Sequence, residues 1–335
     1  MAMIDFFNLK EELTQIIETD GSIGILTHKN PDGDGLCAAL AMQEIFQNLG
    51  RDADIILEYP APDQYDFLDG KKRTKVFSEH LYYKNLILVD CHEEERVRNC
   101  APLLPTANKI IAIDHHPKGE LIENALTYID TEMVSAGAII YNLFQEEIRN
   151  LPKDSANYAA KAFYTTIIND TDNFLNRNVD RETFRICSEL MQHNIEPGEI
   201  TEQFLLSKSA STVAFVGDVL GTIDTYDQDQ ILFIHFTRAM MAERGVGNEA
   251  TSKLIRWVKG TKEMLVAVSF QEVNETRYRL SMRSNCINVN KICVKYGGGG
   301  HTKASGCEIK GSLAELKKLI LEEMRPEIAE FLGRK

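Results

Sequence analysis

The chain has 335 residues, 44% of them hydrophobic and 26% charged, a composition typical of a soluble globular protein. This length is long for one domain and comfortable for two. No apolar run approaches the roughly 20 residues of a membrane helix, and the first residues lack the features of a secretion signal. The seven cysteines form no Cys-x-x-Cys pair. We therefore expect reduced thiols and a cytoplasmic protein without a membrane partner.

The net charge of −13 is distributed unevenly. Residues 1–209 contain 19 Lys and Arg against 35 Asp and Glu, a balance of −16, whereas residues 210–335 contain 18 against 15, a balance of +3. An acidic first part suits cation binding and a mildly basic second part suits an anionic substrate, although ordinary surface variation would also explain the difference. The overall negative charge argues against extensive sequence-independent binding of duplex nucleic acid.

The first part of the chain alternates short apolar runs with amphipathic stretches. Strands are predicted at residues 22–28, 54–58, 85–91 and 109–114, with a weaker candidate at 128–129. Apolar spacing of three or four predicts helices at residues 35–48, 134–148 and 155–169. This alternation predicts an α/β fold with a largely parallel sheet flanked by helices on both faces.

The pattern changes after a helical stretch at residues 180–212, which ends in a run of small residues. Strands are then predicted at residues 230–236, 264–270 and 277–282, and helices at 247–258 and 313–324. These elements indicate a second, smaller α+β domain. We predict a catalytic domain over residues 1–190, a linker over 191–212 and a substrate-binding domain over 213–335.

Four apolar segments of the first part end in aspartate or histidine. The polar residues are His28, Asp32 and Asp34 after the first, Asp90 after the second, Asp114, His115 and His116 after the third, and Asp170 after the fourth. In open α/β sheets, ligands bind at the carboxyl ends of the strands. Carboxylates and imidazoles without a thiolate suit Mn²⁺, or less often Mg²⁺, Fe²⁺ or Zn²⁺. This number of groups suits two metal ions, which activate water and clamp an in-line phosphoryl transfer.

Each of these residues has a structural alternative when taken alone. Asp32 and Asp34 could form a turn or cap a helix, and Asp90 could also cap a helix. His115 and His116 could be an ordinary exposed pair. The joint pattern is far more specific than any one of its members, so we predict a metal centre.

A second candidate site lies in the second domain, where consecutive glycines precede His301. The backbone N–H groups of such a run can converge on an anion, although a flexible loop is the alternative. Arg283 lies at the end of a predicted strand. Its guanidinium group matches a terminal phosphate, although a carboxylate partner could take the same place.

The order and spacing of these residues resemble the DHH phosphoesterase superfamily, and the C-terminal part resembles its DHHA1-type substrate domain. The first match rests on His28-x-x-x-Asp32-x-Asp34, Val89-Asp90, Asp114-His115-His116 and Asp170-Thr171. The second rests on Ser281-Met282-Arg283-Ser284 and Gly297-Gly298-Gly299-Gly300-His301. The resemblance covers residues 15–325 or so. It is nearest to bacterial bifunctional oligoribonucleases that also act on 3′-phosphoadenosine 5′-phosphate.

The resemblance implies a role for each matched residue. One metal ion would be held by His28, Asp32 and Asp90, and the other by Asp34, Asp90, His115 and Asp170. His116 and Asp114 would be catalytic: His116 would face the scissile phosphate, and Asp114 would hydrogen-bond a ligand imidazole. Substrate would contact Arg283, Ser284, Gly298, Gly299, Gly300 and His301. The two metal ions would be Mn²⁺, with Mg²⁺ as the alternative.

The resemblance also implies the reaction. The chain would be a hydrolase acting on phosphoester bonds of short single-stranded RNA, of 3′-phosphoadenosine 5′-phosphate, or of both, in a cleft between its domains. Pyrophosphate or polyphosphate, cyclic or linear dinucleotides, longer single-stranded DNA and a nucleotide-binding sensor without turnover stay open as alternatives. A homodimer is compatible with the sequence. The segment Asp172-Asn173-Phe174 stands where the family often has glycine, and it leaves the substrate ranking open.

Overall fold

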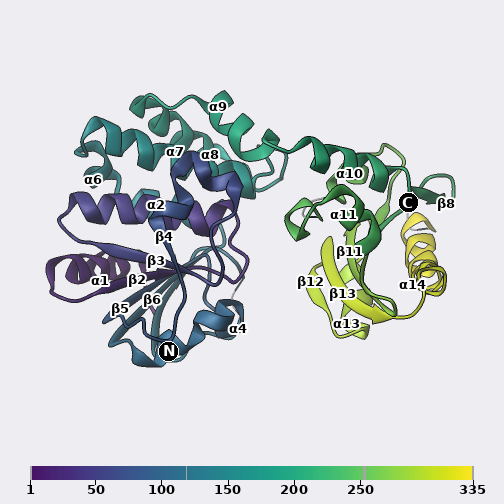
Figure 1. Cartoon of the computed structure of the whole chain (residues 1–335), viewed down its shortest axis with the longest axis horizontal. Coiled ribbons are helices and arrows are strands. Elements are labelled where there is room, and N and C mark those ends of the chain that lie inside the picture. Colours follow the sequence, from purple (N-terminus) through teal and green to yellow (C-terminus); the bar gives the residue numbers. More distant parts are fainter. Residues whose placement is uncertain (1, 118, 252–253, 334–335) are drawn as a thin grey trace. The chain divides into compact units, whose positions relative to one another are not determined.

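A computed structural model describes residues 2–117, 119–251 and 254–333. The chain divides into two compact units, Met1–Ser207 and Lys208–Lys335 (Figure 1). The division falls inside the stretch 191–212 expected to be a linker. Residues of that stretch before the division form helical turns of the first unit, namely η3 (Met191–His193), α9 (Pro197–Thr201) and η4 (Glu202–Leu206).

The described part of the first unit contains a seven-stranded sheet in which every neighbouring pair is parallel. In spatial order its strands are β1 (Ala2–Met3), β7 (Ala125–Ile129), β6 (Lys109–Asp114), β5 (Asn85–Val89), β2 (Ile23–Leu26), β3 (Ala53–Leu57) and β4 (Thr74–Val76). The four strong strand predictions and the weaker one correspond to β2, β3, β5, β6 and β7. The two short edge strands β1 and β4 were not predicted.

Helical layers cover both faces of this sheet, because successive side chains of a buried strand point to opposite sides. Ile25, Ile87 and Ile111 form one row of paired residues on the first face. That face packs against α1 (Phe6–Glu18), α2 (Gly33–Asn48), α5 (Ala136–Leu143), α6 (Gln145–Arg149), α7 (Lys153–Asp170) and α8 (Arg181–Leu190). The row that starts at Leu26 faces the other layer, which includes α4 (Glu94–Val97) and η2 (Arg98–Thr106). Figure 1 shows α2 and α7 on one side of the strands and α4 on the other.

Two features of the helices differ from the prediction. The expected helix 134–148 is interrupted at Phe144, which ends α5 and precedes α6. Helix α1 was not predicted, although Asp5 caps it by accepting a hydrogen bond from the Asn8 amide at 2.8 Å. The segment between β3 and β4 forms two further short helices, η1 (Asp63–Leu68) and α3 (Gly70–Arg73).

The second unit contains a six-stranded mixed sheet in its described residues. In spatial order the strands are β12 (Gly299–His301), β13 (Ala304–Lys310), β11 (Arg277–Ser284), β10 (Val266–Asn274), β9 (Ile231–Phe236) and β8 (Asp224–Tyr226), and only β9 and β10 run parallel. Helices α13 (Val289–Lys295) and α14 (Leu313–Gly333) cover one face, and α10 (Ala210–Leu220), α11 (Arg238–Arg244) and α12 (Arg256–Lys259) cover the other. The predicted fold class is therefore confirmed for both parts of the chain.

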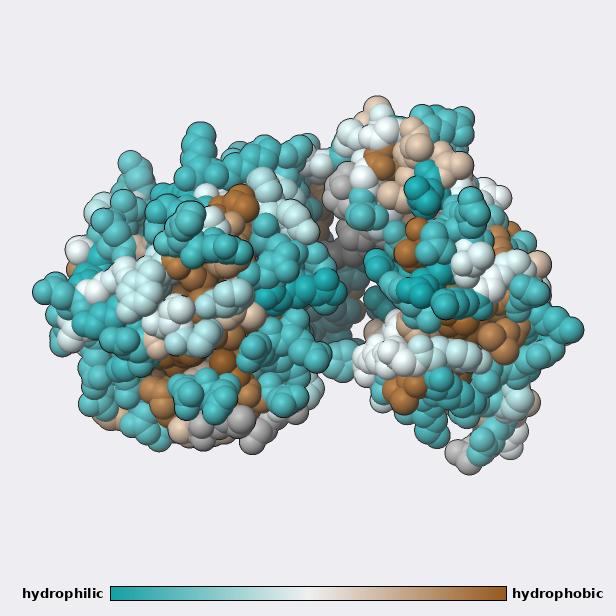
Figure 2. Space-filling model, turned by 60° about the horizontal axis from the view of Figure 1, so that its bottom comes forward, coloured by the Kyte–Doolittle hydropathy of each residue, from teal (hydrophilic) through white to brown (hydrophobic). Residues whose placement is uncertain are grey.

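The expected helix 247–258 is described as two short pieces, η5 (Asn248–Thr251) and α12, while residues 252–253 lie outside the described part. Of the described helices, none has the length and apolar character needed to cross a bilayer. The face drawn in Figure 2 is mostly hydrophilic, with hydrophobic residues in separate patches on both units. The apolar side chains are thus mainly buried in the cores already described.

Candidate metal centre

Three neighbouring strands of the first unit end at nearly the same level and carry the predicted metal ligands. Leu26 of β2 pairs with Leu88 of β5, and Val89 of β5 pairs with Ile113 of β6. His28 and Asp90 therefore follow adjacent strand ends, beside the His115–His116 pair that follows β6. The N-terminus of α2 and the C-terminus of α7 bring the remaining carboxylates to the same place.

The first group of ligands consists of His28, Asp32 and Asp90. His28 Nε2 lies 3.3 Å from Asp90 Oδ2 and 3.7 Å from Asp32 Oδ1. Asp32 caps α2, and its Oδ1 accepts the amide hydrogen of Asp34 at 3.0 Å. Gly35 lets the helix start this close to β2, because a Cβ there would lie 2.0 Å from the Thr27 hydroxyl oxygen. One side-chain atom from each member lies within 4.8 Å of the others, as a shared ion would require.

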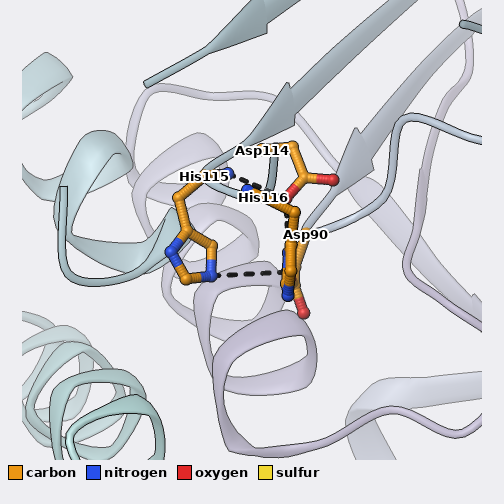
Figure 3. Close-up of side chains that lie close together, drawn as sticks. All are labelled: Asp90, Asp114, His115 and His116. Atoms are coloured by element: carbon orange, nitrogen blue, oxygen red, sulfur yellow. Dashed lines mark hydrogen bonds and ion pairs between the residues drawn. The ribbon is translucent and has the colours of Figure 1, made fainter. Parts of the chain in front are cut away.

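The second group consists of Asp34, His115 and Asp170. His115 Nε2 lies 2.9 Å from Asp170 Oδ2, 3.6 Å from Asp34 Oδ2 and 3.8 Å from Asp90 Oδ1 (Figure 3 shows the ring directed at Asp90). His115 Nδ1 lies 3.3 Å from the carbonyl oxygen of Met133, which can only accept a hydrogen bond. This contact favours a proton on Nδ1 and leaves the Nε2 lone pair directed at the carboxylates, the arrangement of a metal-bound imidazole.

Asp34 is fully buried and is held by the N-terminus of α5. Its two carboxylate oxygens accept hydrogen bonds from the amides of Ala136 at 2.6 Å and Gly137 at 2.9 Å. Burial, followed by repulsion from Asp170 and Asp90, raises the pKa of Asp34 well above its usual value. Burial also raises the pKa of Asp170. These carboxylates can all be ionised together only if a cation compensates their charge.

Two buried atoms of the cluster make no hydrogen bond of regular geometry with the described residues, although a histidine or carboxylate atom lies near each of them. They are Asp90 Oδ1 and His115 Nε2, which belong to the two residues facing both groups. Asp90 also has a φ of 57°, in the left-handed region that aspartate seldom occupies. Buried polar atoms without regular hydrogen bonds and backbone strain are costly, and they persist mainly at functional sites. The residues present therefore fit a centre for divalent cations.

Asp114 and His116 form a third arrangement beside the two groups (Figure 3). Asp114 Oδ1 accepts the amide hydrogens of His115 at 2.7 Å and His116 at 3.0 Å, and lies 2.9 Å from His116 Nδ1. His116 Nδ1 is also 3.1 Å from Asp90 Oδ1. Hydrogen bonds to Asp114 and then to Asp90 raise the pKa of His116 to about 10.

The contacts of Asp114 differ in one respect from the role expected for it. Its imidazole partners are His116 and His92, whereas it reaches the ligand His115 only through the backbone amide. The reason is local: the carboxylate turns back over the two amides that follow it, while the His115 ring turns toward Met133.

Four contributors to this site were not predicted from the sequence. His92 lies two residues after Asp90 on the same strand end, so the argument used for the other residues could have identified it. The amides of Ala136 and Gly137 and the carbonyl of Met133 are backbone groups, and residue types carry no signal for them.

In the second unit, the strand registers bring Arg283 and His301 into one row. Ala304 of β13 pairs with Arg283 on one side and with His301 on the other. Residues directly opposite one another point to the same face, so both side chains belong to the face that also carries Ala267. Two strand spacings separate them, or roughly 10 Å. An anionic group of nucleotide size would span this distance.

The guanidinium group of Arg283 is available for such an anion. It is half-buried, and its Nη1 donates to the carbonyl of Met282 at 2.9 Å. Burial lowers its pKa. Among the described residues, no carboxylate forms an ion pair with it, so the alternative of a structural carboxylate partner finds no support there.

The other residues predicted to bind substrate contribute to the fold. Gly299, Gly300 and His301 form the exposed edge strand β12 instead of a free loop. Gly298 is required by close packing, because a Cβ there would lie 2.1 Å from the carbonyl oxygen of Gly306. Ser284 is buried, and its hydroxyl accepts hydrogen bonds from two amides of the following turn.

Comparison with known protein families agrees with this architecture. Residues 22–167 match the N-terminal domain of the DHH family, and residues 232–330 match the DHHA1 domain. The chain therefore carries a DHH N-terminal domain and a DHHA1 domain. The phosphoesterase superfamily predicted from the sequence is thereby confirmed.

The chain is also similar along most of its length to named relatives. It is 26% identical to the bifunctional oligoribonuclease and PAP phosphatase NrnA of Thermus thermophilus, covering 92% of this chain and 91% of that protein. It is 24% identical to the Bacillus subtilis protein of the same name, over 90% and 93% of the two chains. The crystal structure of an exopolyphosphatase-related protein from Bacteroides fragilis has the same fold, with a TM-score of 0.86, 21% identity and coverage of 96% and 97%.

Proposed function

We propose that this chain is a two-metal phosphoesterase that hydrolyses short RNA oligonucleotides to 5′-mononucleotides and removes the 3′-phosphate of 3′-phosphoadenosine 5′-phosphate. The observation that carries the proposal is the position of Asp90 between two ligand groups: its Oδ2 lies 3.3 Å from His28 Nε2 and its Oδ1 lies 3.8 Å from His115 Nε2. The names of the two relatives support the choice of substrates. The location we propose is the cytoplasm, consistent with seven free cysteines.

The chemistry of the donors supports two divalent ions, Mn²⁺ as the first choice and Mg²⁺ as the alternative. One would be held by His28, Asp32 and Asp90, and the other by Asp34, Asp90, His115 and Asp170. When bound, such a pair supplies activation of water and neutralisation of charge on the phosphoryl oxygens. We assign the remaining steps to residues outside these two groups.

His116 would donate a proton to the leaving group. Hydrogen bonds from the amides of His115 and His116 keep the Asp114 side chain fixed, and its hydrogen bonds with His116 and His92 hold its pKa well below the usual range despite burial. An ionised carboxylate only accepts hydrogen bonds, so His116 donates through Nδ1. A proton on His116 Nε2 is then available to the departing oxygen, which is general acid catalysis.

The second unit would recognise the nucleotide. Arg283 offers a half-buried guanidinium group without a carboxylate partner among the described residues, and His301 stands in the same cross-strand row. A fork of N–H donors binds a terminal phosphate in two places at once. The glycines of β12 leave the backbone of this edge accessible to the ligand.

The test is a substrate panel with purified protein and Mn²⁺. We expect turnover of a linear RNA dinucleotide and of 3′-phosphoadenosine 5′-phosphate, and much slower turnover of pyrophosphate, a cyclic dinucleotide and a 24-residue DNA strand. Asp170→Asn should abolish turnover, whereas Asp154→Asn, an exposed carboxylate on the same helix, should not. Turnover that persists in excess chelator, with no metal found by elemental analysis, would overturn the proposal.

A further inference from the structure

We infer that His92 is a positioning residue for the chemical step, which fixes Asp114 and, through it, His116. This inference rests on the proposed function, because it concerns the proton carried by His116. His92 belongs to neither ligand group. The residue is 1% exposed, and its side chain lies beyond Asp114 as seen from His116, in contact with the other carboxylate oxygen.

The neighbours of His92 determine which ring nitrogen carries the proton. The backbone amide of Gly119 donates to His92 Nε2 at 3.1 Å, and an amide N–H has no lone pair to accept. Nε2 therefore accepts this hydrogen bond, and the nearest carboxylate oxygen, Glu93 Oε1, lies 4.0 Å away, beyond hydrogen-bond distance. The ring hydrogen is thus placed on Nδ1. That nitrogen lies 2.6 Å from Asp114 Oδ2. His92 thus donates to Asp114, and this direction is set by a backbone group that cannot change its role.

The hydrogen bond from His92 completes the set of donors around Asp114. Oδ1 accepts from two amides and from His116 Nδ1, and Oδ2 accepts from His92. With donors on both oxygens, the carboxylate cannot rotate, and the His116 ring is held with Nε2 directed away from it. Without His92, a fully buried oxygen would lose its donor, and the carboxylate would be free to turn.

His92 also anchors the segment that follows His116. Besides the Gly119 contact, its carbonyl oxygen accepts the amide hydrogen of Ile122 at 3.1 Å. A purely structural role would consist of this anchoring alone. The two roles use different ring atoms, Nδ1 for Asp114 and Nε2 for Gly119, so substitutions can separate them.

The experiment compares His92→Asn with His92→Gln. The asparagine amide nitrogen can replace Nδ1 as donor to Asp114 but does not reach Gly119. The glutamine side-chain oxygen can replace Nε2 as acceptor for Gly119 but leaves no donor at the Nδ1 position. We expect His92→Gln to lower kcat on a linear RNA dinucleotide by about 10- to 100-fold, the usual cost of an outer-shell change. We expect His92→Asn to retain most of kcat, and both variants to keep KM and metal content.

Several outcomes would overturn the inference. Equal kcat values for the two variants, a loss confined to KM, or a loss of bound metal would assign His92 to anchoring or to the metal centre. The exposed His80, changed to Asn and to Gln, provides the matched control. If wild-type protein hydrolyses no phosphoester, the proposed function fails instead, and the two failures are distinguishable.

A measurement independent of turnover covers the case in which His92→Gln does not fold. In protein with ¹⁵N-labelled histidine, His92 should show a protonated Nδ1 and an unprotonated Nε2, assigned by the signal missing from His92→Asn. The opposite tautomer would contradict donation to Asp114 from a ring fixed by Gly119.

Discussion

Removal of metal should strongly destabilise the first unit. Its ligand groups bring buried carboxylates together, with Asp34 fully buried and the pKa of Asp34 and Asp170 raised by burial. Ions that bind the folded chain but not the unfolded chain stabilise it by RT ln(1 + [L]/Kd), about 2.7 kcal/mol per site at a concentration of 100 Kd. Two such sites contribute about 5 kcal/mol. In a unit of 150–250 residues, each kcal/mol shifts Tm by roughly 2–4 °C, so we expect a shift of roughly 10–20 °C.

The size of this shift should depend on pH in a defined direction. Burial alone would lower the pKa of His28, but its hydrogen bonds to Asp32 and Asp90 raise it to about 9. The protonated ring therefore stabilises the metal-free fold below pH 6.5, and this stabilisation is lost as the pH rises to 9. A metal ion needs Nε2 without its proton, so it competes with that proton below pH 9. The metal-induced shift should grow between pH 6.5 and 9.

Differential scanning calorimetry of the full chain, with Mn²⁺ and with chelator, measures the effect. Asp34→Asn should lose part of the shift, because it removes one ligand of the second group and leaves the first intact. Asp154→Asn should behave like the wild type. A shift below 2 °C at saturating Mn²⁺, or one that shrinks as the pH rises from 6.5 to 9, would refute the reasoning.

Three further substitutions test single residues. Asp90→Asn should weaken binding of both ions and abolish turnover, measured by elemental analysis and steady-state kinetics; one ion retained at full affinity would show that Asp90 is not shared. His116→Asn keeps a donor toward Asp114 but removes Nε2, so kcat should fall by about 10²- to 10⁴-fold at unchanged metal content. Arg283→Ala should lower kcat/KM for 3′-phosphoadenosine 5′-phosphate by roughly 30- to 1000-fold, from about 2–4 kcal/mol, and barely affect a nitrophenyl phosphodiester. Equal losses on both substrates would place Arg283 in the chemical step.

The ends of the strands could be predicted because each apolar run is followed there by aspartate or histidine. The apolar runs before His28, Asp90 and Asp114 indicate buried parallel strands, and parallel strands place their carboxyl ends at one edge. The grouping of ligands could not be derived in the same way. Whether Asp34 faces Asp32 or Asp170 depends on the orientation of α2, which is set by packing against α5 and α7 and has no local signal.

The glycine run adopts a more regular conformation than the expected loop. Consecutive glycines were expected to form an anion-binding loop, yet Gly299 and Gly300 continue into an edge strand paired with β13. A contact between this segment and β13 determines its conformation. Gly298 lies so close to the carbonyl oxygen of Gly306 that a side chain would not fit. Here glycine allows two backbone segments to approach closely. The sequence alone does not distinguish this role from that of a flexible loop.

The strained backbone and the crowded carboxylates of the first unit have one explanation in common. Asp90 adopts a left-handed conformation, and its carboxylate lies close to those of the other ligands, among them the fully buried Asp34. Gathering these carboxylates destabilises a metal-free fold because their charges repel, and a cation bound between them removes that repulsion. Selection for stability alone would favour apolar or neutral residues at these positions, like those of the adjoining core. Their presence together at one strand edge therefore reflects the chemistry performed there, with the surrounding sheet providing the stability that the site lacks.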